Sequence, residues 1–301
     1  MTNKTKISLH KAYSTDGIEL DSILFEPLKK TKKIIIHVHG KEGNFVQNHF
    51  VSVLGNRYAE NGYAFLTFNN RGHDYMADLI KKTSTGFIWE QGGSMYDILE
   101  DSQYDIQGVI TYVLDLGFDE IILQGHSLGP HKICYYIVNN PNHKVSKIIL
   151  LTTADVRYQF DFMVPEWEKY SLIAKRLVNE GKGKELMPVK LWSNCPISAA
   201  SFWNYTNPNN NCFVFNGTHP ENEYKNFNKI TLPILVVNPD NDVATGIKQE
   251  KAIQFLKERT ASKNFQAFII KNCTHGFLSK EEELAGVILN WLKKEQLYRK
   301  Q

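Results

Sequence analysis

Apolar residues in this chain gather in short runs that are separated by polar turns. Such runs are typical of strands buried on both faces of a parallel sheet. They occupy residues 33–39 (KIIIHVH), 63–69 (YAFLTFN), 120–124 (EIILQ), 147–152 (KIILLT), 234–238 (ILVVN) and 265–271 (FQAFIIK). Two earlier strands are expected at 6–14 and 18–26, joined by a hairpin turn at Asp16-Gly17.

The segments between the later runs have helical spacing of their apolar residues. They cover residues 47–61, 95–115, 130–139, 246–260 and 280–297. Strands that alternate with helices predict an α/β fold with a doubly wound, mostly parallel sheet and helices on both faces.

One long segment, residues 153–231, interrupts this alternation. It contains a predicted helix near 165–180 and then a stretch rich in Asn, Pro and aromatic residues. The segment is too long for a plain connection, and long insertions are often functional. We therefore expect a core domain of residues 1–152 and 232–301, with 153–231 inserted as a cap or lid. The alternative is an irregular excursion with a purely structural role.

Composition narrows the class of protein. The 301 residues are 42% hydrophobic and 22% charged, as in ordinary globular proteins, and the net charge is only +3. This balance gives no reason to expect nucleic acid or an anionic membrane as a partner.

No apolar stretch approaches the roughly 20 residues of a membrane-spanning helix. The N-terminus resembles no secretory signal, and the four cysteines form no CxxC pair. We expect a cytoplasmic protein with free thiols.

The strongest chemical signal is the sequence Gly125-His126-Ser127-Leu128-Gly129. It follows a predicted strand directly and precedes a predicted helix, which is the context of a nucleophile elbow. Serine at the apex of so tight a turn needs small residues on either side, and Gly125 and Gly129 meet that need. We predict that Ser127 is a nucleophile. The alternative is a glycine-rich turn without chemistry.

A serine nucleophile requires a base, and the chain has ten histidines. His275 lies between the last predicted strand and the last predicted helix. In a doubly wound sheet this loop opens at the edge where the serine also lies. His275 is therefore the predicted general base.

The third member should be a carboxylate between Ser127 and His275 in the chain, at the carboxyl end of a strand. Asp242 is preferred, because the apolar residue after it can seat its loop on the core. Asp240 is the alternative acid, and Asp155, after the run at 147–152, is a third candidate.

Acyl transfer also requires donors for an oxyanion. We expect the backbone N–H groups of Leu128, next to the nucleophile, and of Lys41, in the loop after residues 33–39. Gly40 is the fallback for Lys41.

A metal site is not expected. His37 and His39 form an H-x-H pair, but the continuation Gly40-Lys41-Glu42 lacks the x-D-H that metal-dependent hydrolases add to it. No cofactor is expected either.

Taken together, His39-Gly40, the sequence NRGH at 70–73, GHSLG, PDNDV at 239–243 and THGF at 274–277 resemble the α/β-hydrolase superfamily in kind and in order. There is a fainter similarity to the branch that contains siderophore-ester hydrolases. The resemblance implies an eight-stranded, mostly parallel sheet, a two-step acyl-enzyme mechanism and no cofactor. The sequence departs from the common pattern at Pro130 and at Asn69-Asn70.

The expected function is that of a serine hydrolase that cleaves an ester or thioester of a small acyl substrate. Two alternatives remain at this point. One is an acyltransferase, or a thioesterase serving a carrier protein, with the same three residues. The other is a non-catalytic binding protein on a hydrolase scaffold.

Overall fold

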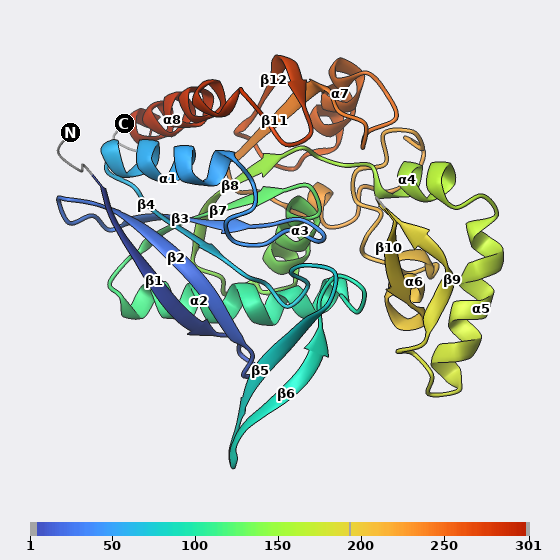
Figure 1. Cartoon of the computed structure of the whole chain (residues 1–301). Coiled ribbons are helices and arrows are strands. Elements are labelled where there is room, and N and C mark those ends of the chain that lie inside the picture. Colours follow the sequence, from blue (N-terminus) through green and yellow to red (C-terminus); the bar gives the residue numbers. More distant parts are fainter. Residues whose placement is uncertain (1–4, 193, 299–301) are drawn as a thin grey trace.

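The computed structural model describes residues 5–192 and 194–298. Its centre is an eight-stranded sheet in the order β1-β2-β4-β3-β7-β8-β11-β12 (Figure 1). The strands are β1 (Thr5–Tyr13), β2 (Glu19–Pro27), β3 (Lys33–Val38), β4 (Ala64–Phe68), β7 (Glu120–His126), β8 (Val145–Leu151), β11 (Ile234–Asn241) and β12 (Phe265–Thr274). Strand β2 pairs antiparallel with both β1 and β4, and all other pairs are parallel. The predicted fold class and the eight strands are confirmed.

Helices cover both faces of the sheet, as Figure 1 shows. One face carries α1 (Phe50–Glu60) and α8 (Glu281–Tyr298), and the other carries α2 (Ser102–Asp115), α3 (Gly129–Asn139) and α7 (Gln249–Arg259). Successive residues of β3 alternate between these layers: Ile34 and Ile36 pack with α2 and α3, whereas Ile35 packs with α1 and α8. Because both faces are buried, the strand reads as an unbroken apolar run.

Two hairpins lie outside the main sheet. Strands β5 (Ala77–Thr83) and β6 (Gly86–Gly92) form one that projects from the body in Figure 1. The other is formed by β9 (Leu186–Leu191) and β10 (Cys195–Ser198). Residues 153–231 also contain α4 (Val156–Met163), α5 (Trp167–Asn179), α6 (Ala199–Thr206) and the short 3-10 helix at Phe227–Lys229.

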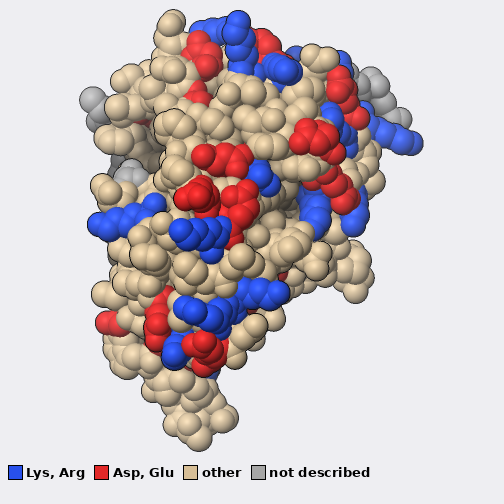
Figure 2. All heavy atoms as spheres, turned by 90° about the vertical axis from the view of Figure 1, so that its right-hand side faces the viewer, with Lys and Arg blue, Asp and Glu red and all other residues tan. Residues whose placement is uncertain are grey.

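The segment 153–231 packs in two parts. Residues from Val156 to Cys212 form a hydrophobic cluster of their own, to which Leu99 and Leu128 of the main body also belong. Residues from Val214 to Ile230 instead contribute to the cluster between the sheet and α2, α3 and α7. Figure 2 views the molecule from the side that carries this segment, and basic and acidic side chains are interspersed there. No helix in the described residues is both long enough and apolar enough to cross a membrane.

Candidate active site

The turn between β7 and α3 places Ser127 at the carboxyl edge of the sheet. Ser127 has a φ of 60°, a strained value for a residue with a side chain. Its N–H donates to Leu151 O at 3.1 Å and to Thr152 Oγ1 at 2.9 Å. A Cβ on Gly125 would lie 2.6 Å from the carbonyl carbon of Gly129, and one on Gly129 would lie 2.1 Å from Val38 O. The turn is therefore too tight for any larger residue at these two positions.

The structure brings Ser127, His275 and Asp242 together from three strand ends. His275 Nε2 lies 2.9 Å from Ser127 Oγ, and His275 Nδ1 lies 2.8 Å from Asp242 Oδ1. A carboxylate only accepts, so Nδ1 carries the proton and Nε2 is free to accept from the serine hydroxyl. This geometry is that of a nucleophile, a base and an orienting acid.

Asp242 is almost completely buried, with its side chain 1% exposed. Burial acts to raise its pKa, but the hydrogen bond and the charge of His275 outweigh burial and hold the pKa below its usual value. Its Oδ1 also accepts from the N–H of Ala244 at 2.9 Å. The carboxylate is thus kept ionised and fixed in position beside the imidazole.

The two other candidate acids have different partners. Asp240 accepts from the N–H groups of Asn272 and Cys273, both at 3.0 Å, and so ties β11 to the end of β12. Asp155 accepts from Tyr158 N–H at 2.9 Å and caps α4, and it also binds Thr218.

The two expected oxyanion donors lie on neighbouring loops. A Cβ on Gly40 would lie 3.1 Å from the Leu128 nitrogen, so the loop after β3 runs directly beside the nucleophile turn. In the part of the chain that the structure describes, neither the Leu128 N–H nor the Lys41 N–H donates to another protein group. Both are therefore free to bind a ligand oxygen.

Two buried histidines that the sequence pattern does not place in the site form hydrogen bonds with its loops. His126 Nε2 donates to the carbonyl oxygen of His275 at 2.9 Å. His39 Nδ1 donates to Gly40 O at 2.8 Å, and its Nε2 accepts from Asn70 N–H at 3.1 Å. Burial lowers the pKa of each to about 3, so both stay neutral. Among the described residues no cluster of three metal-ligating side chains exists.

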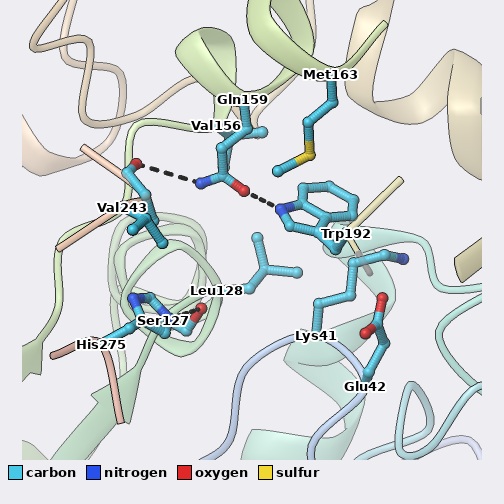
Figure 3. Close-up of a pocket in the computed structure, with 12 residues that line it drawn as sticks. Lys41, Glu42, Ser127, Leu128, Val156, Gln159, Met163, Trp192, Val243 and His275 are labelled. Atoms are coloured by element: carbon cyan, nitrogen blue, oxygen red, sulfur yellow. Dashed lines mark hydrogen bonds between the residues drawn. The ribbon is translucent and has the colours of Figure 1, made fainter. Parts of the chain in front are cut away.

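A cavity of about 290 Å³ opens beside Ser127 and His275. Figure 3 shows these two at one end and Lys41, Glu42 and Trp192 at the other. Helix α4 supplies Val156, Gln159 and Met163; the other lining residues are Leu128, Ala154, Val243 and Ala244.

The wall of this cavity is mostly apolar, and part of it is fixed by Gln159. Gln159 Nε2 donates to Ala244 O at 3.3 Å, and its Oε1 accepts from Trp192 Nε1. Of the aromatic residues in the segment 153–231, Trp192 lines the cavity. Phe202 and Tyr205 are instead buried inside the cluster of the segment 153–231.

Comparison with known proteins identifies a family and a fold. Residues 83–293 match the family described as "Protein of unknown function (DUF1749)". Among curated proteins, none has a significantly similar sequence.

Several solved structures are similar over almost the whole chain. Siderophore hydrolase EstB from Aspergillus fumigatus is 13% identical, with a TM-score of 0.69, over 98% of this chain and 99% of its own. Alpha/beta hydrolase GrgF from Penicillium sp. sh18 is 14% identical, with a TM-score of 0.67, over 96% and 98%. Est1E from Butyrivibrio proteoclasticus, solved with ferulic acid, is 19% identical, with a TM-score of 0.62, over 94% and 98%. These likenesses confirm the α/β-hydrolase fold.

Proposed function

The chain belongs to the family described as "Protein of unknown function (DUF1749)", and we propose that it is a serine hydrolase acting on carboxylic esters or thioesters. The observation that carries the proposal is the pair of short contacts, Ser127 Oγ to His275 Nε2 at 2.9 Å and His275 Nδ1 to Asp242 Oδ1 at 2.8 Å. The strained turn under Ser127 and the cavity beside it add support.

In the proposed reaction His275 Nε2 accepts the Ser127 hydroxyl proton while Oγ attacks the carbonyl carbon. The resulting oxyanion binds the N–H groups of Leu128 and Lys41. His275 then gives its proton to the leaving alcohol or thiol as the acyl bond breaks. Water attacks the acyl-enzyme, loses its proton to His275, and releases the acid and the serine hydroxyl. Asp242 orients the imidazole throughout.

The segment 153–231 acts in this proposal as a cap over the sheet edge. Its contribution is the wall made by Val156, Met163 and Trp192, which suits an apolar acyl or alcohol group. The cavity, at about 290 Å³, lies near the lower end of the roughly 300–1,000 Å³ of small-molecule sites. A small substrate is therefore favoured.

The test is hydrolysis of p-nitrophenyl esters from acetate to decanoate by the wild type and by Ser127→Ala. We expect turnover that is fastest for the short acyl chains, and a loss of roughly 10⁴-fold or more in Ser127→Ala. Ser52→Ala, which changes an exposed serine on α1, is the matched control and should retain full activity. Full activity in Ser127→Ala would refute the proposed nucleophile.

A further inference from the structure

The side chain of Lys41 runs inward from the loop after β3 to a point where three segments meet. Its Nζ donates to the backbone oxygen of Ser94, just after β6, at 2.6 Å. Burial lowers the pKa of Lys41, and the negative charge of Asp97 opposes that effect. Among the described residues Lys41 forms no salt bridge with a carboxylate. Lys41 is half-buried, and the hydrogen-bond partner of its ammonium group is a backbone carbonyl oxygen, without the carboxylate that usually accompanies a charge taken out of water.

This ammonium also lies over two aromatic rings of the segment 153–231. Nζ lies 5.3 Å from the ring centroid of Trp192 and 5.4 Å from that of Tyr205, and these rings are 5.7 Å apart. Both distances lie within the range of cation–π attraction. Figure 3 shows the Lys41 side chain extending beneath Trp192.

The backbone of the same residue carries the expected oxyanion donor. His39 holds the carbonyl oxygen of Gly40 at 2.8 Å, and in a trans peptide the following N–H points the opposite way. The Gly40–Lys41 peptide is therefore held on one side by His39 and on the other by the anchored Lys41 side chain. Lys41 also lines the cavity together with Ser127.

We propose that the Lys41 ammonium is a positioning group that joins the oxyanion loop to Ser94 and to the Trp192–Tyr205 pair. It thereby holds the Lys41 N–H in place, and acyl transfer depends on how the segment 153–231 is seated. This inference rests on the proposed hydrolase function. The side chain touches no reacting atom; it acts through its own backbone.

The test compares Lys41→Met, which keeps an unbranched stem but removes the charge and the donors, with Lys41→Arg, which keeps both. We expect kcat for p-nitrophenyl acetate to fall roughly 10- to 100-fold in Lys41→Met, less than for outright loss of an oxyanion donor, while KM changes little. Lys41→Arg should recover most of the kcat. The rate at which a fluorophosphonate labels Ser127 should follow the same order, since its phosphoryl oxygen occupies the same donors.

A second pair of variants tests the link to the aromatic rings. Tyr205→Leu removes the ring and should lower kcat, whereas Tyr205→Phe keeps the ring and should retain more of the wild-type kcat than Tyr205→Leu does. In the Lys41→Met background, Tyr205→Leu should cause little further loss, because the contact is already absent. Thermal unfolding of each variant checks the fold, and Lys41→Gln replaces Lys41→Met if the latter is poorly folded.

The possible failures are distinguishable. If wild type hydrolyses esters and Ser127→Ala does not, but Lys41→Met keeps the wild-type kcat, the positioning role is wrong and the hydrolase proposal stands. If kcat/KM falls equally in Lys41→Met and Lys41→Arg because KM rises, the positioning role is also wrong. A wild type that neither hydrolyses any ester nor reacts with the fluorophosphonate overturns the proposed function, and the positioning role with it.

Discussion

Asp240 and Asp242 lie two residues apart and show that the surroundings of a carboxylate determine its role. Asp242 is buried and faces His275, whereas the Asp240 carboxylate accepts from two backbone N–H groups at the end of β12. Both pKa values lie below the usual value, Asp240 because of its two backbone donors and Asp242, despite burial, because of His275. A lowered pKa alone does not identify the acid; the partner does.

This difference predicts unequal effects of the same substitution. Asp242→Asn should lower kcat roughly 10³- to 10⁴-fold, because an amide can donate to Nδ1 and so favours the wrong imidazole tautomer. Asp240→Asn, the matched control, should stay within a few-fold of wild type. Steady-state kinetics on one p-nitrophenyl ester measures both. Equal losses would mean that the loop geometry, and not the Asp242–His275 contact, limits activity.

At the scale of elements, helix α4 connects the segment 153–231 to the cavity. Asp155 caps its first turn with one carboxylate oxygen, while the other accepts from the N–H and the hydroxyl of Thr218, both at 2.8 Å. One side chain therefore ties the start of α4 to a loop that is distant in sequence. Burial raises the pKa of Asp155, and its hydrogen bonds oppose this.

Asp155→Ala should lower the free energy of unfolding by about 1–3 kcal/mol, through loss of the cap and of the acceptor for Thr218. Because α4 forms the cavity wall, KM should rise more than kcat falls. Urea unfolding and ester kinetics measure these effects. Thr218→Val, which removes only the hydroxyl, should lower the free energy of unfolding and raise KM by less than Asp155→Ala does. A kcat as low as that of Ser127→Ala in a fully stable Asp155→Ala would instead identify Asp155 as the catalytic acid.

At the scale of the whole molecule, four histidines are buried around the sheet: His37, His39, His126 and His131. Burial lowers the pKa of each to about 3, whereas an unfolded histidine has a pKa of about 6.5. Between these values the unfolded chain binds more protons than the folded one. The contribution of these histidines to the free energy of unfolding is therefore complete above about pH 6.5 and decreases as the pH falls.

The free energy of unfolding should consequently decline between pH 7 and pH 5.5, with each buried histidine contributing a slope that approaches about 1.4 kcal/mol per pH unit. Urea titrations across this range measure the slope. His131→Leu, which removes the imidazole next to Phe215, should reduce the slope by close to one proton. An unchanged slope in His131→Leu would contradict the assignment.

The sequence predicts the eight strands of the main sheet because each is an apolar run or lies beside an evident turn. It does not predict the β5–β6 hairpin, where Phe87 and Trp89 are 60% and 70% exposed and no buried face imposes a pattern. In the same way, chain order and turn context point to Ser127 and His275, but they leave Asp242, Asp240 and Asp155 open as the acid. The reason that favoured Asp242, an apolar residue after it seated on the core, is wrong, because Val243 is 80% exposed. The contacts of Lys41 with Ser94 and of His126 with His275 span 53 and 149 residues, and no local pattern encodes them.

All four cysteines, Cys134, Cys195, Cys212 and Cys273, are buried and unpaired. A label directed at thiols should therefore attach to an introduced, exposed cysteine, and no native cysteine needs to be replaced first. Leu172→Cys on α5, where the native side chain is 69% exposed, would accept a spin label on the segment 153–231. With a second label at the exposed Ser84, between β5 and β6, electron paramagnetic resonance could follow the distance from this segment to the hairpin as an ester analogue binds.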